Sequence, residues 1–449
     1  MNRRNAFYYS LTVLLVALMF VWPMGRTIAL RLVLFFSALA CAGWLIRLEG
    51  RQVVAADSLC VKAPFYLWLA LSAWILVGAL TFAADPAKVL IELRGQWLRG
   101  GLAGLLGFLA ASLALRGRSP VSPPLLFTLI VAPMFLQTLL QDVYSLWLWR
   151  DNGSLPYDQT LFIEGKAKVS YVTNTALSIV CAELMARLAF ARRFLPIASR
   201  WLAALVPLLL LCLYLLGARN GVIGAVLLFL SCLVFYGIAQ RKRMHGAVLA
   251  LFLALGVSGV AGFAWVAEKA DLRWQSFVQT VPLALDTVTH RAWLNPQLYP
   301  YPPLADGRPV DISAYERLAW IKEGALLLKD HPLGFGFSRT AFSDGLVAKY
   351  PGEALPGAHS HSGLLDIALG TGVPGLLMWF GMIACLFVLG WRGFFRHHHP
   401  AGLALLFVLM GFFGRSLIDS NLRDHMLEQS FFLCGLLAAF ALPQNKNEP

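Results

Sequence analysis

One histidine stands at the start of a long apolar run, where an ionisable side chain could do proton chemistry. The segment AHSHSGLLDIALGTGVPG covers residues 358–375, and its second histidine, His361, comes directly before the run. An imidazole titrates near neutral pH and can take a proton from a hydroxyl group. A lone histidine at such a boundary is more often bonded to a backbone carbonyl. The other ionisable residues on the same side of the apolar segments are therefore needed to distinguish a general base from a structural histidine.

Two arginines are candidates for binding an anion. Arg219 lies in LLGARNGVIG, a short turn between two apolar runs, and Arg317 lies in SAYERLAWIKEGALLLKDHP, residues 313–332. A guanidinium group binds phosphate oxygens through a two-pronged fork. The alternative for Arg219 is contact with lipid headgroups. The alternative for Arg317, slightly favoured by spacing alone, is a solvated helix face with Glu316 or Asp311 as partner.

The apolar runs that position these residues are typical of membrane-spanning helices. The chain has 449 residues, of which 58% are hydrophobic and 14% are charged, far below the charge of a soluble domain. A helix needs about 20 apolar residues to cross a bilayer. We therefore expect an all-α polytopic membrane protein with about twelve spans. They run over 6–22, 27–46, 64–83, 97–115, 124–142, 169–190, 201–217, 221–239, 246–266, 363–390, 401–418 and 427–442.

The distribution of Lys and Arg predicts the orientation of these spans. With the N-terminus inside, the inside segments hold 16 Lys and Arg against 3 Asp and Glu, and the difference equals the formal net charge of +13. This is the positive-inside pattern, so both termini are expected in the cytoplasm. The positive net charge is then explained by the orientation of the spans and does not imply a nucleic-acid partner. The first span lacks a cleavage site and is expected to stay as an anchor.

Three parts are expected: spans 1–9 in residues 1–266, a large outer loop at 267–361, and spans 10–12 in residues 362–449. The outer loop is nearly neutral and has no cysteine. Ser313 and Glu316 match a capping box at the start of a helix that ends before Pro332. Apolar residues at helical spacing predict its buried stripe, and these are Leu318, Ile321, Ala325 and Leu328. A second helix is expected over about 273–290, interrupted by Pro282.

Further charged residues on the outer side are candidates of lower rank. Arg415, Asp419, Arg423 and Asp424 cluster in the last outer turn, where they pair with one another or extend an anion site. Arg99 precedes the fourth span, and His359 either supports His361 or faces water. The triplet His397–His399 is interpreted as a solvated patch on the cytoplasmic side. No metal site and no cofactor are expected.

Three motifs in this order resemble the bacterial O-antigen ligases. His361-Ser362 followed by nine residues and Gly372-x-x-Gly375 is similar to that family's histidine signature. Arg219 in a short outer turn after the seventh span resembles its first essential arginine. Arg317, ahead of HPLGFGF at 331–337, resembles the second. The departure is Ala-Arg-Asn-Gly around Arg219, where family members often carry Ser-Arg-Gly.

The resemblance implies a fold of the C-type (GT-C) class, with a helical periplasmic subdomain, and a glycosyltransferase of the bacterial inner membrane. The donor would be a glycan on undecaprenyl pyrophosphate and the acceptor a sugar hydroxyl of lipid A-core, joined at the periplasmic face without metal. His361 would be the base, and Arg219 and Arg317 would bind the pyrophosphate. The alternatives are an O-antigen polymerase, an O-linked oligosaccharyltransferase, or, more distantly, a transporter of lipid-linked precursors. A transporter should show repeats or mid-membrane charges, which the sequence hardly offers.

Overall fold

The computed structural model describes residues 2–50, 59–241, 246, 250, 254, 256–259, 261–262, 272–354, 360–422 and 424–442. All regular structure in these ranges is helical, and they form no strand. The helices are α1 (Arg3–Val21), α2 (Ile28–Glu49), α3 (Leu59–Thr81), α4 (Pro86–Glu92), a π-helical turn (Leu93–Trp97), α5 (Leu98–Arg116), α6 (Pro123–Asn152), α7 (Lys166–Phe190), α8 (Ser199–Leu215), α9 (Arg219–Gln240), α11 (Leu272–Leu285), α12 (Ile312–Asp330), α13 (Ala341–Lys349), α14 (Gly363–Phe395), α15 (Pro400–Ser416) and α16 (Asp424–Phe440).

The helices form a multi-pass membrane bundle. Eight helices of the described chain are long and apolar enough to cross a bilayer. Shorter apolar helices occupy three further predicted spans, and these are α8, α15 and α16. Eleven of the twelve predicted spans thus correspond to helices. The ninth, 246–266, falls largely outside the described residues, so the number twelve stays a prediction, as does the GT-C class.

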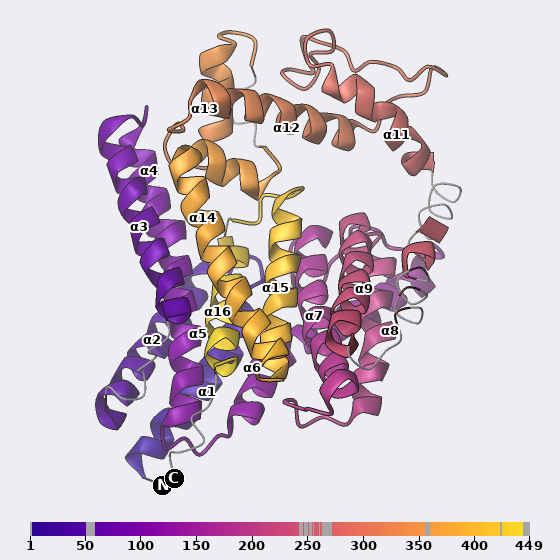
Figure 1. Ribbon diagram of the computed structural model, residues 1–449. Coiled ribbons are helices and arrows are strands. Elements are labelled where there is room, and N and C mark those ends of the chain that lie inside the picture. Colours follow the sequence, from indigo (N-terminus) through magenta and orange to yellow (C-terminus); the bar gives the residue numbers. More distant parts are fainter. Residues whose placement is uncertain are drawn as a thin grey trace.

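Contacts between loops show which segments share an end of the bundle. At one end, Met24 bridges to Ile163, and Gly363 N donates to Asp419 O at 3.0 Å. Residues 272–354, with α11, α12 and α13, lie across this end, whereas α1 begins at the opposite end (Figure 1). The opposite end brings the ring of Phe194 to His399 and the hydroxyl of Tyr8 to Glu49. These contacts show which loops share an end of the bundle. The end that carries residues 272–354 is called the outer end, and its location in the periplasm stays a prediction.

Helix α14 is broken at Gly372, and the segment 332–335 docks into the break. Gly372 has φ +67° and ψ −172°, which interrupts the helix. Phe335 N donates to the freed Leu369 O at 2.7 Å, and Val373 N donates to Pro332 O at 2.8 Å. A Cβ on Gly372 would lie 2.4 Å from Pro332 O. Gly372, the first glycine of the Gly-x-x-Gly signature, therefore makes room for the HPLGFGF segment, and the break leaves the predicted span as two helical pieces.

The outer residues build their own apolar core, in which several local predictions were wrong. Helix α12 is capped by Asp311, whose Oδ1 accepts from Ala314 N at 3.2 Å, instead of by Ser313. Ile321 and Ala325 are exposed, because the buried face of α12 is Tyr315, Ala319, Trp320, Glu323, Gly324 and Leu327. Helix α11 continues through Pro282, which was expected to interrupt it, and ends at Leu285, before the predicted end near 290.

Candidate active site at the outer end of the bundle

His361 lies between the outer core and the start of α14. Its backbone has φ +49°, a left-handed conformation that is uncommon for a residue with a side chain. Its ring stacks on Trp320 of α12, with centroids 5.4 Å apart and planes 7° from parallel. The imidazole is half-buried. Such backbone strain persists only where the surroundings hold it, and it is concentrated at functional sites.

Two buried serines hold the backbone on either side of His361. Ser360 Oγ donates to Asp366 Oδ1 at 2.7 Å and accepts from Ser362 N at 3.1 Å. Ser362 Oγ donates to Ser416 O at 3.0 Å and caps α14 by accepting from Leu365 N at 3.3 Å. These hydrogen bonds fix the backbone on either side of His361 and leave its ring partly exposed.

Helix α12 carries Arg317 on the face that it turns toward α14. A Cβ on Gly324 would meet Leu365 at 2.9 Å, so α12 packs closely on the first turn of α14. Arg317 lies three residues before Trp320, about one turn or roughly 4.5 Å along the axis. Arg317 is half-buried, and within the described ranges no carboxylate pairs with it. Neither partner considered from the sequence binds it, because Glu316 accepts from the Tyr301 hydroxyl and Asp311 pairs with Arg219.

Arg219 is the first helical residue of α9, and it faces Asp311. Its Nη1 donates to Asp311 Oδ2 at 3.2 Å, and its side chain keeps 37% exposure. Ala218 provides no side-chain cap for α9. Where family members often have serine, the first-turn amides of α9 thus lack a side-chain acceptor, and such amides favour an anion. Part of Arg219's charge is balanced by Asp311, a partner that the sequence did not indicate.

Two of the lower-ranked arginines, Arg415 and Arg99, are paired. Arg415 is buried and donates to Asp419 Oδ2 at 2.9 Å, which is the pairing predicted within the turn. It also donates to Ser170 Oγ at 3.1 Å and to Ala167 O at 2.6 Å, and these two bonds join α15 to the start of α7. Arg99 lies 3.3 Å from Glu428, which also accepts from Trp22 at 2.9 Å, in a network of α5, α16 and α1. His359 and Arg423 lie outside the described residues.

The histidine triplet is partly built into the fold, so the solvated interpretation was wrong for His399. His399 caps α15 through Nδ1, which accepts from Ala401 N at 3.2 Å, and its ring contacts Phe194. Burial, and to a smaller extent the charge of His397, lowers the pKa of His399 to about 4. In the described ranges, no three His, Cys, Asp or Glu side chains gather as metal ligands.

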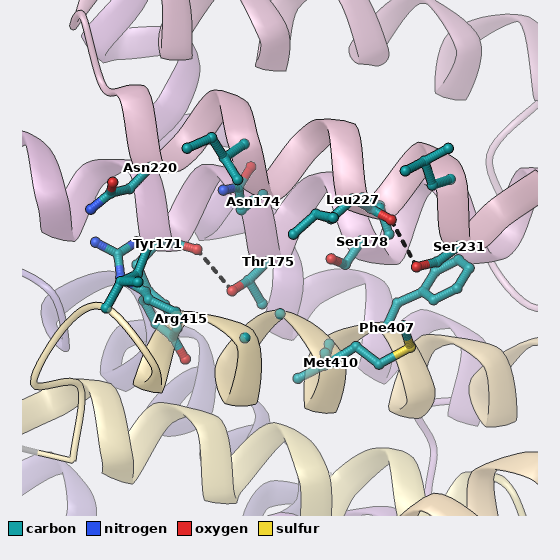
Figure 2. A pocket seen from close by; sticks show the side chains of 18 of the residues that line it. Tyr171, Asn174, Thr175, Ser178, Asn220, Leu227, Ser231, Phe407, Met410 and Arg415 are labelled. Atoms are coloured by element: carbon teal, nitrogen blue, oxygen red, sulfur yellow. Dashed lines mark hydrogen bonds between the residues drawn. The ribbon is translucent and has the colours of Figure 1, made fainter. Parts of the chain in front are cut away.

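A cavity of about 470 Å³ opens between α7, α9 and α15 (Figure 2). Arg415, Tyr171 and Asn220 lie at one end of it (Figure 2). Asn220 directly follows Arg219 in the chain. Apolar residues line most of its length, and these are Ile223, Leu227, Leu228, Leu230, Val234, Phe235, Phe407, Val408 and Met410. From Asn220 to Val234 the groove follows α9 for roughly 21 Å. Sequence reasoning did not find this groove, because its lining resembles any other apolar helix face.

Comparison with known proteins adds one match. Residues 203–380 match a family model described as O-antigen ligase. The match includes α8, α9, all of the described outer residues and the first half of α14, and therefore Arg219, Arg317 and His361. No curated protein matches the chain.

Proposed function

We propose, from the match of residues 203–380 to the family model described as O-antigen ligase, that this protein is a lipopolysaccharide O-antigen ligase. It transfers a glycan from undecaprenyl pyrophosphate to a sugar hydroxyl of lipid A-core, at the periplasmic face of the inner membrane and without metal. The observation that carries the proposal is His361, which is held in a strained backbone and stacked on Trp320, one turn from Arg317, for which the described residues offer no carboxylate partner.

His361 is the general base in this proposal. A nitrogen of its neutral ring takes the proton from the acceptor hydroxyl while that oxygen forms a bond to the anomeric carbon. The bond from the anomeric carbon to the diphosphate oxygen breaks, and the electron pair leaves with undecaprenyl pyrophosphate. The barrier falls if the charge that grows on the diphosphate is stabilised where it develops.

Arg219 and Arg317 supply that stabilisation. Arg317 has no carboxylate partner within the described ranges, so its fork is available to phosphate oxygens. The uncapped first turn of α9 adds amide donors beside Arg219. Losing one such contact in the transition state costs roughly a hundredfold or more in rate.

The groove between α7, α9 and α15 is the proposed path of the donor's isoprenoid chain. Its polar end adjoins Arg219, and its apolar part runs into the bundle. An isoprenoid that enters from the bilayer exchanges one apolar environment for another, so the groove holds it by van der Waals packing and not by removal from water. The diphosphate would then lie at the outer end, beside the arginines.

Reconstituted transfer with purified protein tests the proposal. Undecaprenyl-pyrophosphate glycan is the donor and lipid A-core the acceptor, with excess EDTA, beside His361→Ala, Arg219→Ala and Arg317→Ala. Decoration of lipid A-core by the wild type alone, with all variants folded, supports the ligase. Lengthened donor glycans would instead indicate a polymerase, and a labelled protein acceptor an oligosaccharyltransferase. Variants that transfer as well as wild type would remove these residues from the site.

A further inference from the structure

Trp320 meets His361 face to face and is itself firmly held. Its indole is 8% exposed, and its Nε1 donates to Trp293 O at 2.9 Å. The ring of Phe342 also packs against it in an edge-on arrangement, with the ring centroids 6.2 Å apart. The indole plane is thus set by the outer core, and the imidazole lies parallel to it at 5.4 Å.

We propose that Trp320 is a positioning residue that keeps the His361 ring flat and stabilises the imidazolium formed when His361 accepts a proton. The catalytic part rests on the proposed function. An indole face attracts a cation within about 6 Å of its centroid, and tryptophan does so better than any other aromatic residue. The neutral ring gains less, so the stack favours the state that the proton transfer creates.

Among the described residues of α12, α13, α14 and the end of α15, four carboxylates have partners of their own, whereas Arg317 of α12 pairs with no described carboxylate. Glu323 of α12 accepts from Tyr350 at 3.1 Å and lies 3.5 Å from Lys349. Asp344 of α13 accepts from Thr340 at 2.7 Å. On α14, Asp366 accepts from Ser360, and at the end of α15 Asp419 pairs with Arg415. None of these pairs includes Trp320, so its substitution changes the stack and leaves the charges in place.

Titration of the histidine signals by NMR tests the stack without requiring activity. The chain has nine histidines, and His361→Asn identifies the signal of His361 in labelled protein. In Trp320→Leu, the pH at which half of His361 is protonated should fall by roughly half a unit to one unit. Trp320→Phe keeps a ring and should shift less. Trp293→Phe alters a buried indole of the same core that faces Tyr350, and serves as the matched control.

The pH profile of transfer gives the second measurement. Because the base acts in its neutral form, the rise of kcat/KM with pH should move to lower pH in Trp320→Leu, with a lower plateau. An unchanged midpoint in both measurements, or an equal shift in Trp293→Phe, would overturn the proposal. If Trp320→Leu shifts the NMR titration of His361 but the wild type transfers no glycan, the role of the stack stands and the proposed function is rejected.

Discussion

Arg219 at the start of α9 binds Asp311 at 3.2 Å, and the same carboxylate caps α12. One side chain therefore joins the first candidate arginine to the helix that carries Arg317 and Trp320. In Asp311→Asn the cap survives, because asparagine caps helices as well as aspartate does. The charge that orients Arg219 is lost, so kcat/KM should fall by about tenfold, the cost of roughly 1.4 kcal/mol, with little change in Tm.

The matched control is Asp306→Asn, which breaks an exposed pair with Arg308 in the same outer region. It should transfer like wild type. Equal rates in Asp311→Asn and Asp306→Asn would show that Arg219 needs no orientation by Asp311.

Arg317 should matter for rate and hardly for stability. Since no carboxylate of the described chain pairs with it, Arg317→Ala leaves no buried counter-charge behind. We expect a loss of about a hundredfold in kcat with Tm within about a degree of wild type. Arg317→Lys should recover only part, because an ammonium lacks the fork. Lys329→Ala, exposed on the same helix, is the control, and a large drop of Tm in Arg317→Ala would indicate a structural role.

We expect that even a single added methyl group at Gly372 destabilises the protein. Gly372→Ala places a Cβ 2.4 Å from Pro332 O at φ +67°, so the break and the docked segment 332–335 cannot both persist. Gly153 has the same φ of +67° with nothing within 4 Å. Gly153→Ala should therefore cost only the left-handed strain of about 1 kcal/mol. Thermal unfolding in detergent compares the two, and equal Tm losses would contradict the docking.

Filling the groove should discriminate between donors by chain length. A Cβ on Gly411 meets only Ser178 Oγ at 4.0 Å, so Gly411→Leu places its side chain in open groove space. The KM for undecaprenyl-pyrophosphate glycan should rise about tenfold if the leucine displaces buried chain, while a donor with a short isoprenoid chain should keep its KM. Gly43→Leu, which faces open space on α2, is the control. Equal effects on both donors would place the chain elsewhere.

His399 should make stability fall with acidification. Burial lowers its pKa to about 4, so protonation opposes folding and removes the Nδ1 acceptor that caps α15. The stabilisation is complete above the unfolded value near 6.5 and is lost as pH falls toward 4, about 2 kcal/mol at pH 5. His399→Asn keeps a cap without titrating. Unfolding of both proteins from pH 7.5 to 5 measures the difference, and parallel curves would refute it.

Most of the bundle could be predicted from the sequence because a membrane span is a local property. About twenty apolar residues predict a spanning helix whatever they pack against, and the charges of the loops predict on which side of the membrane each end of the helix lies. The cap of α12 could not be settled in this way. Asp311 and Ser313 both suit an N-cap, and the choice depends on Thr280, whose hydroxyl accepts from Asp311 N at 3.2 Å across the loop.

The site was predictable in its residues and not in its contacts. His361, Arg219 and Arg317 stand out by type and position, whereas pairing depends on side chains far away in the chain. Arg219 finds a carboxylate 92 residues on, Arg415 finds Ser170 on α7, and Arg317 has no such partner within the described ranges. The stacking of Trp320 gave no sequence signal beyond its spacing from Arg317.

Helix α12 is fastened near both of its ends. Asp311 ties its beginning to α9, and the segment after its end is hydrogen-bonded into the break of α14. Because α12 is held near both ends, it cannot swing aside like a lid. Under the proposed ligase function, the two lipid substrates therefore reach His361 laterally, from within the plane of the bilayer.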